Sequence, residues 1–367
     1  MPLTTINGIA NELEVSHVTA RKYLDILPVF GYQAVERVSY KSSTQMISFI
    51  QKRIKEEGVK KGIKDLDFKT ASFNGMTDIL NVQTLYKKKG NSTTIAFNNF
   101  KGGVAKTTVT SNLAAILAYL NQKVLMIDMD MQNQLSDSFQ TKSYGEYNIA
   151  DIITDTVQNG KVNTQKLKKT IDTIDIGNNK KVDILPSYWN LGKQLLNSYI
   201  IAQQNDMNLG LILRKIVNAI KNDYDFILID TSPTNVIALE MSFFASDLIA
   251  LVSTAEEKSI SSLNYLRKEL KLLTKDATLF NLQIEINSLI VTKFNKGIKE
   301  NRDNLKSLKY IQKKDKIKNL YIFKEKALVE KANAEKKPLI AYNQDRKESI
   351  NAIEGLIDYA IYLIERS

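Results

Sequence analysis

From Thr93 onward, short continuous apolar runs alternate with longer stretches in which apolar residues recur every three or four positions. The apolar runs are TTIAFNNF (93–100), KVLMIDMD (123–130), VDILPS (182–187), YDFILIDTSP (224–233), DLIALVST (247–254) and INSLIVTKF (286–294). Such runs are typical of strands buried on both faces, and the stretches between them predict helices. The alternation predicts an α/β fold with a mostly parallel, doubly wound sheet covered by helices on both faces. Ligands of such sheets bind at the carboxyl ends of the strands.

The first 45 residues follow a different pattern. One helical pattern ends near Leu13 and the next begins at Ser16, which is a good N-cap. Two short helices joined by a tight turn predict a small helical winged helix-turn-helix domain, with residues 30–42 as the wing. The stretch SHVTARKYLDIL resembles the recognition helix of winged-helix repressors. The side chains predicted to face the major groove are Ser16, His17, Thr19, Arg21 and Lys22. An ordinary helical hairpin with a solvated face is the alternative.

Charge is distributed unevenly along the 367 residues, whose net charge is +11. Residues 1–90 carry 14 Lys/Arg against 9 Asp/Glu, residues 293–347 carry 17 against 7, and the remainder carries 20 against 24. Clustered positive charge favours contact with a polyanion such as nucleic acid, although a lysine-rich surface that only aids solubility has the same composition.

Composition also excludes several kinds of site. There are no cysteines, so disulfides, thiolate metal sites and thiol nucleophiles are excluded. The sequence shows no signal peptide and no apolar run as long as a membrane span. A cytoplasmic location is therefore expected.

A phosphate-binding loop is predicted at KGGVAKTT (101–108), between a predicted strand and a predicted helix. The glycines let a phosphate approach the backbone, and the helix N-terminus adds partial positive charge. Lys106 would reach the β- and γ-phosphates, and the Thr107 hydroxyl would bind Mg²⁺. The residues expected to contact the nucleotide are Lys101, Gly102, Gly103, Val104, Ala105, Lys106, Thr107 and Thr108.

Lys101 is one lysine more than such a loop needs. In an isolated loop its side chain would point away from the loop's own phosphates, and it could neutralise phosphate charge across a dimer interface instead. The pattern K-G-G-x-x-K-T-T closely resembles the deviant Walker A motif of the ParA/MinD family of ATPases, whose leading lysine reaches the partner's nucleotide in a sandwich dimer. The resemblance implies ATP and Mg²⁺ as cofactors, catalytic roles for Lys101 and Lys106, and an ATP-dependent homodimer. A merely solvent-exposed lysine is the alternative.

Two acidic segments resemble further motifs of this family. The segment LMIDMDMQNQ (125–134) resembles the D-x-D-P-Q segment, with Met131 in place of the proline. This resemblance implies that Asp130 orients the attacking water and that Asp128 is a structural or Mg²⁺-side group. The run FILIDTSPT resembles the Walker B strand, which implies that Asp230 binds Mg²⁺ through water.

The resemblance extends over about 93–365 and implies a place for the adenine. The stretch IVTKFNKG (290–297) lies where the family often contacts this base, and Asn295 is the candidate residue. The chain is therefore divided into a helix-turn-helix DNA-binding domain (1–57), a linker or connecting helix (58–92) and a P-loop ATPase domain (93–367).

The basic region 296–349 matches the side on which ParA-type dimers bind DNA without sequence preference when ATP is bound. The candidate phosphate contacts are Lys324, Lys326, Lys336, Lys337, Arg346 and Lys347. A solvated lysine surface is the alternative. The last segment, 349–367, predicts a packing helix and not a membrane-surface helix, because its polar face carries more acidic than basic residues.

These motifs together predict an ATP-dependent DNA-partitioning ATPase, nucleoid-associated in the cytoplasm. Its sandwich homodimer would coat nonspecific DNA, and a centromere-binding partner protein would stimulate hydrolysis and release it. The N-terminal domain would bind operator DNA for autoregulation, as in the plasmid-type members, and no membrane partner is expected. The alternatives are a transcriptional repressor that senses nucleotide and a MinD-like positioning ATPase.

Overall fold

A computed structural model of the chain describes residues 92–139, 141, 147–177, 179–324, 327–342 and 346–366. Within the last range, the side chains of residues 346–348, 350 and 351 are not described. The predicted helix-turn-helix domain and the connecting segment up to residue 91 lie outside the described residues.

The described residues form one eight-stranded sheet with the strand order β3-β4-β2-β5-β1-β6-β7-β8. All neighbouring strands pair in parallel except β3, which is antiparallel to β4. The strands are β1 (Thr93–Asn98), β2 (Val124–Met129), β3 (Asp172–Asp175), β4 (Lys181–Leu185), β5 (Phe226–Thr231), β6 (Leu248–Thr254), β7 (Glu285–Phe294) and β8 (Asn319–Lys324). The predicted mostly parallel sheet is confirmed.

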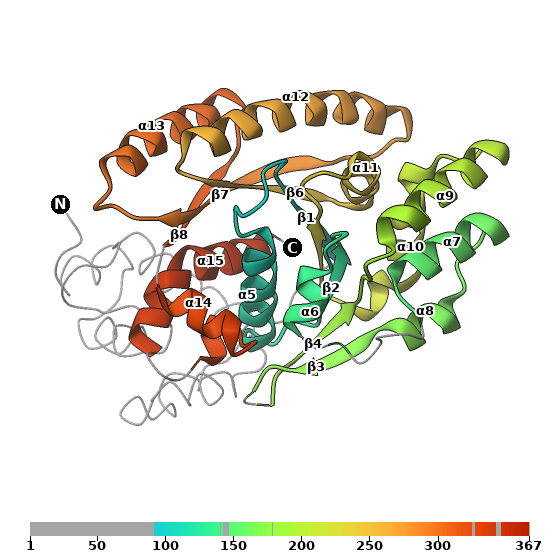
Figure 1. The fold of residues 1–367 in the computed structure, drawn as a ribbon, viewed down its shortest axis with the longest axis horizontal. Coiled ribbons are helices and arrows are strands. Elements are labelled where there is room, and N and C mark those ends of the chain that lie inside the picture. Colours follow the sequence, from blue (N-terminus) through green and yellow to red (C-terminus); the bar gives the residue numbers. More distant parts are fainter. Residues whose placement is uncertain are drawn as a thin grey trace, which may run out of the picture.

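Helices cover both faces of this sheet (Figure 1). The α-helices are α5 (Lys106–Tyr119), α6 (Gln134–Ser138), α7 (Ile149–Asn159), α8 (Thr164–Thr170), α9 (Leu191–Gln204), α10 (Ile212–Ile220), α11 (Val236–Ala245), α12 (Glu257–Leu279), α13 (Lys299–Lys314), α14 (Ala327–Ala334) and α15 (Arg346–Arg366). Short 3-10 helices are η3 (Leu209–Leu211), η4 (Lys221–Asp223) and η5 (Leu339–Ala341).

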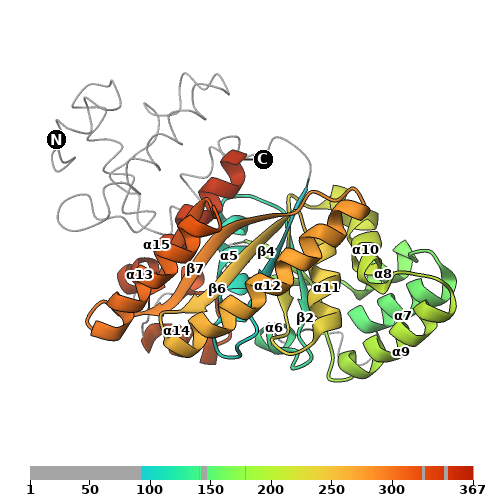
Figure 2. The same ribbon diagram turned by 90° about the horizontal axis from the view of Figure 1, so that it is seen from above.

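Two hydrophobic cores lie on opposite faces of the sheet. One core joins the strands to α5, α14 and α15, and the other joins them to the layer that contains α7, α9, α10, α11, α12 and α13. Figure 2 shows α12 and α13 lying across the sheet while α7, α8 and α9 extend beyond its other end. The last helix, α15, packs against β8 and α5 with Ile353, Leu356 and Ile357 buried, so the predicted packing role of the C-terminal segment is confirmed.

The six predicted strands form the centre of the sheet, and the two remaining strands are at its edges. The DTID sequence of β3 alternates between half-buried and exposed positions, and β8 is half-buried along most of its length. The sequence of β3 has no continuous apolar run, whereas β8 has a short one at 320–323 that was not predicted as a strand. Parallel pairing aligns Asp128 with Asp230, and Phe97 with Asp230. The carboxyl ends of β1, β2 and β5 therefore meet at one edge.

Candidate functional site

The loop between β1 and α5 forms one wall of a cavity at the carboxyl edge of the sheet. Gly103 has a φ of 74° and Ala105 a φ of 66°, so the chain takes two left-handed turns before α5 begins at Lys106. A Cβ at Gly103 would meet no atom within 4 Å, so space does not require a glycine here. The positive φ does, because it favours glycine over other residues. The amino end of α5 is thus directed at the cavity, as the motif predicted, and such an end attracts phosphate.

The cavity has a volume of about 490 Å³, which fits a nucleotide-sized ligand. Its lining consists of Gly102, Gly103, Val104, Ala105, Lys106, Thr107, Thr108, Asp130, Gln132, Gln134, Pro233, Lys293, Phe323, Lys324, Val329, Glu330 and Asn333. Seven of these residues belong to the predicted phosphate loop. The far wall comes from the end of β8 and from α14, and sequence patterns gave no signal for it because β8 itself was not predicted.

Lys106 is almost fully buried beneath the loop. Its Nζ donates hydrogen bonds to the carbonyl oxygens of Asn99 (3.2 Å) and Lys101 (3.5 Å). Burial lowers the pKa of Lys106, and the charges of Asp230 and Asp130 oppose this shift. An ammonium with only carbonyl partners and two nearby carboxylates is well suited to receive phosphate oxygens.

Asp230 and Thr107 are joined at the base of the cavity. Thr107 Oγ1 donates to Asp230 Oδ2 at 2.7 Å, whereas the buried Asp230 Oδ1 has no hydrogen-bond partner among the described residues. Burial, followed by the charge of Asp128, raises the pKa of Asp230 to about 7. A buried carboxylate oxygen without a donor needs a cation or its hydration water, so these residues fit the predicted Mg²⁺ site.

Asp128 and Asp130 have different environments although they are two residues apart. Asp128 is fully buried: its Oδ1 accepts from Asp130 N (2.9 Å) and its Oδ2 from Ser136 N (2.9 Å) and Ser136 Oγ (2.7 Å). Burial raises the pKa of Asp128 to about 6. Of the two roles predicted for Asp128, this contact set favours the structural one, since both oxygens anchor the loop after β2. Asp130 lines the cavity together with the residues of the loop.

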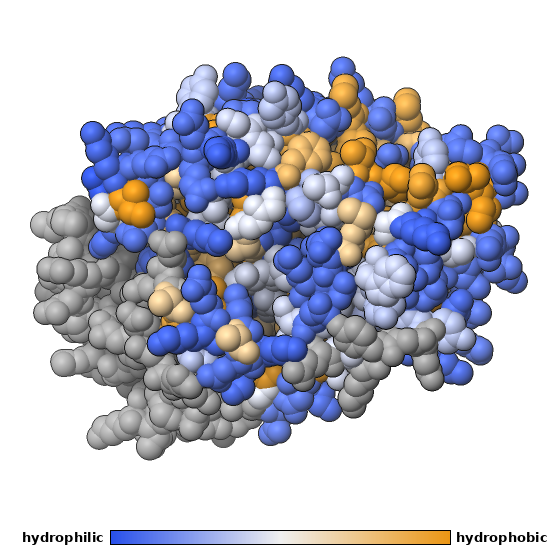
Figure 3. All heavy atoms as spheres, in the orientation of Figure 1, coloured by the Kyte–Doolittle hydropathy of each residue, from blue (hydrophilic) through white to orange (hydrophobic). Residues whose placement is uncertain are grey.

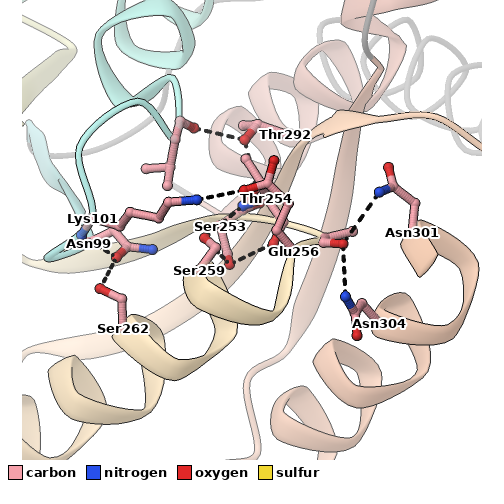
Figure 4. Close-up of polar contacts among 12 residues, drawn as sticks. Asn99, Lys101, Ser253, Thr254, Glu256, Ser259, Ser262, Thr292, Asn301 and Asn304 are labelled. Atoms are coloured by element: carbon pink, nitrogen blue, oxygen red, sulfur yellow. Dashed lines mark hydrogen bonds and ion pairs between the residues drawn. The ribbon is translucent and has the colours of Figure 1, made fainter. Parts of the chain in front are cut away.

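Lys101 forms an ion pair within its own chain. Its Nζ lies 2.5 Å from Oε2 of Glu256, the residue immediately before α12 (Figure 4). Its backbone N–H donates to Asn99 Oδ1 at 2.8 Å, and Ser262 Oγ donates to the same oxygen at 2.9 Å. These contacts connect the start of the loop, before its glycines, to the amino-terminal part of α12. Sequence patterns gave no signal for Glu256, which is 155 residues away.

Asn295 is exposed at the turn after β7, and its Oδ1 accepts from Gly297 N at 2.9 Å. Lys293 of the same strand lines the cavity, and Asn295 is not among the lining residues of the described chain. Its contact with adenine stays a prediction. Phe323 and Val329 provide the apolar part of the far wall.

The residues predicted to contact DNA fall into three groups by their location. Lys324 lies in the cavity wall and pairs with Glu354 at 2.9 Å, so it faces the nucleotide cavity. Lys336 and Lys337 are exposed after α14, and Lys337 pairs with Glu335 at 3.2 Å. Lys326 and the residues of the predicted recognition helix lie outside the described residues, as do the side chains of Arg346 and Lys347.

Comparison with known proteins identifies the fold of this site. A family model described as an AAA domain, AAA_31, matches residues 92–286. The chain belongs to this family. An uncharacterised protein of Methanocaldococcus jannaschii is 30% identical over 273 residues, which cover 73% of this chain and 97% of that protein. The sporulation initiation inhibitor protein Soj of Bacillus subtilis is 28% identical over 200 residues, 54% of this chain and 71% of Soj.

A solved structure of a Borrelia burgdorferi B31 protein assigned to plasmid partition, with bound AMPPNP, superimposes on this AAA_31 member with a TM-score of 0.53. It is 26% identical and covers 75% of this chain and 99% of its own. With Soj, it places this AAA_31 member among the ParA-type ATPases, as the loop motif predicted. None of the helices in the described part of the chain is long and apolar enough to cross a bilayer.

Proposed function

We propose that this ParA-type ATPase is a DNA-partitioning enzyme that hydrolyses ATP as a sandwich homodimer. One observation carries the proposal: the loop presents two lysines in different settings. Lys106 is buried beneath its own loop, whereas Lys101 is at the front of the loop with a side chain that is 30% exposed. An exposed lysine in that place is available to a nucleotide held by a second copy.

The remaining residues divide the reaction into three tasks. Lys106 and the amides at the start of α5 bind the phosphates. Thr107 and Asp230 hold Mg²⁺, which supplies charge neutralisation for the phosphates when it is bound. Asp130 orients the attacking water and accepts its proton. Hydrolysis then depends on positioning and charge, because the described cavity offers no side chain that is a stronger nucleophile than water.

Association of two copies has support from the molecular surface. Apolar side chains gather over α9 and α11 on the face seen in Figure 3. Leu196, Ile200 and Val236 are all at least 49% exposed there. Exposed apolar patches of this kind mark contact surfaces. Paired copies would therefore bury apolar area as well as bring Lys101 to the partner's phosphates.

Contact with nonspecific DNA rests on the basic region that follows β7. Exposed lysines of α13 add to Lys336 and Lys337, and Figure 3 shows a mainly hydrophilic surface over α13. Phosphate contacts of this kind carry no base information. A centromere-binding partner would stimulate hydrolysis, and the N-terminal domain would bind operator DNA in the ADP-bound or nucleotide-free protein.

The decisive experiment measures the molecular mass of the protein in solution with ATP and with ADP, and so its oligomeric state. Asp130→Ala protein, in which turnover is blocked, is expected to be dimeric in ATP and Mg²⁺ and monomeric in ADP by sedimentation or light scattering. The same preparation with Lys101→Ala is expected to stay monomeric. A monomer in both cases, with ATP shown to be bound, would refute the sandwich dimer.

Two alternatives make different predictions. A repressor that only senses nucleotide keeps its biological activity after Asp130→Ala, whereas a partitioning ATPase loses DNA segregation. A MinD-like positioning ATPase sediments with anionic liposomes in ATP. The acidic polar face of α15, with Glu354 and Asp358, gives no support to membrane binding.

A further inference from the structure

The strongest contact of Lys101 is made to its own chain. Its Nζ is 2.5 Å from Glu256 Oε2, and the two side chains are 30% and 51% exposed. The hydrogen bond and charge of Lys101 lower the pKa of Glu256, and a hydrogen bond with Thr254 and the charge of Lys293 add smaller effects in the same direction. The ion pair lies at the surface, where another anion can compete for the ammonium.

The backbone of Lys101 is held independently of this ion pair. Asn99 Oδ1 accepts from Lys101 N, and Asn99 Nδ2 donates to the carbonyl oxygen of Val252 at 2.5 Å. Thr292 Oγ1 donates to the carbonyl oxygen of Val104 at 2.7 Å, which fixes the middle of the loop (Figure 4). The side chain of Lys101 can therefore leave Glu256 while its Cα stays in place.

Apart from Lys101, the Glu256 carboxylate has a side-chain hydrogen bond with Thr254. Glu256 is the N-cap residue of α12, yet its side chain makes no capping hydrogen bond. Its backbone carbonyl accepts from Ser259 N and Ile260 N, and a substituted residue would keep those bonds. Lys101 is thus the main partner of this carboxylate, with Thr254 as a second, weaker one.

We propose that Glu256 is a positioning residue that holds Lys101 within its own subunit, and that ATP-dependent pairing exchanges this carboxylate for the phosphates of the partner subunit. The inference rests on the proposed sandwich dimer. Each dimer breaks two Lys101–Glu256 pairs, so the carboxylate opposes pairing unless a triphosphate offers a stronger anion. ADP offers fewer phosphate charges, and Glu256 then retains the lysine.

Glu256→Gln tests this exchange, with Glu257→Gln as the matched control. Both changes remove one negative charge from the start of α12, and Glu257 is exposed in the first turn, whereas Lys101 pairs with Glu256. Any effect of the helix dipole or net charge is therefore common to both variants. Only Glu256→Gln removes the partner of Lys101.

The first measurement is made on nucleotide-free protein and does not depend on pairing. Acetylation of Lys101 by a water-soluble ester, followed by mass spectrometry, is expected to be about two- to fivefold faster in Glu256→Gln, because an exposed ion pair has a stability of that order. The rate for Glu257→Gln should equal that of the unaltered protein. Exposed Lys296 serves as the internal reference.

The second measurement is the dissociation constant of the ATP-bound dimer in an Asp130→Ala background. Glu256→Gln is expected to tighten the dimer by about two- to thirtyfold, since two such pairs no longer need to break. The gain should shrink as salt is raised, because screening weakens the competing ion pair and would not alter a packing effect.

The outcomes separate the two proposals. If the protein pairs in ATP but Glu256→Gln behaves like Glu257→Gln in both measurements, or loosens the dimer, the role of Glu256 is refuted and the sandwich dimer stands. If neither protein pairs in ATP, the sandwich dimer is refuted and the exchange with it.

Discussion

Thr107 Oγ1 donates a 2.7 Å hydrogen bond to Asp230 Oδ2 and so joins the first turn of α5 to the end of β5. The bond orients two oxygen ligands toward the same point at the base of the cavity. The second carboxylate oxygen, Asp230 Oδ1, is buried without a donor among the described residues. The phosphate loop and the acidic strand are therefore joined directly by side chains at the base of the cavity.

Thr107→Ala is expected to weaken Mg²⁺-dependent ATP binding by about 10- to 100-fold, because it removes both a metal ligand and the bond that orients Asp230. Thr107→Ser, which keeps the hydroxyl, should recover most of the affinity. Titration with a fluorescent ATP analogue, with and without Mg²⁺, measures the difference. Equal affinities for the alanine and serine variants would refute the role of the hydroxyl.

Asp130→Ala is expected to lower the turnover rate by about 10²- to 10⁴-fold, because it removes the carboxylate that orients water. ATP affinity should change little, since among the described residues the side chain of Asp130 accepts a hydrogen bond from Gln132 N and makes no other. Steady-state hydrolysis and equilibrium ATP binding test the two parts. A variant that fails to bind ATP would show that Asp130 holds the loop and does not act on water.

Asp128 gives a pH-dependent contribution to stability. Its pKa is raised to about 6 in the folded protein by burial, against about 3.9 in an unfolded chain, so folding favours its protonated form. Its contribution to the free energy of unfolding is therefore full below pH 4 and is lost as pH rises through 6. The stability difference between the unaltered protein and Asp128→Asn should fall by about 1–1.5 kcal/mol from pH 5 to pH 8.

Urea unfolding of the nucleotide-free protein at several pH values measures this difference. The asparagine variant should be less stable overall, because its amide nitrogen cannot accept from Ser136 or Asp130. Only the slope with pH reports the ionisation. A difference that stays constant or grows with pH would contradict the raised pKa.

Gly355→Ala should destabilise the fold although glycine is unfavourable inside helices. A Cβ at Gly355 in α15 would lie 2.4 Å from the carbonyl oxygen and 2.8 Å from the nitrogen of Ile322 in β8. These are backbone atoms, so the helix must move away from the strand, at a cost of about 1–3 kcal/mol. A higher thermal midpoint, as expected for an exposed helical glycine, would show that α15 does not pack this closely.

The basic region is tested by removing two lysines. Lys336→Ala with Lys337→Ala should reduce the salt dependence of nonspecific DNA binding by the ATP-bound protein, with the slope falling by about one to two. The control removes Lys161 and Lys169, which are exposed outside this region. Equal slopes for the two double variants would exclude a specific role for Lys336 and Lys337.

Sequence patterns predicted the centre of the fold because each central strand is a continuous apolar run that ends at a motif. Thr107, Asp130 and Asp230 were predicted from motifs at the ends of β1, β2 and β5, and parallel strands bring these ends together. The edge strand β8 was missed, because its short apolar run at 320–323 lies among lysines. Lys324 at its end lines the cavity, and its contact with DNA stays a prediction.

Contacts between distant residues were equally hidden from the sequence. Nothing in the stretch around Glu256 indicates a partner, and only folding brings it to Lys101. The difference between Asp128 and Asp130 also depends on tertiary structure. Both are acidic residues of one motif. The backbone N–H and the hydroxyl of Ser136 both donate to Asp128 Oδ2, whereas Asp130 lines the cavity.

Two parts of the chain, one within the region that matches the family model and one beyond it, form the walls of the cavity. The loop wall lies within residues 92–286, which match the AAA_31 model, whereas Lys293, Phe323, Val329 and Asn333 of the opposite wall lie beyond that match. A chain cut after residue 286 would keep every phosphate-binding group and lose the surface that encloses the rest of the ligand. Under the proposed function, the C-terminal quarter of the molecule would therefore supply the contacts that discriminate among nucleotides sharing a triphosphate tail.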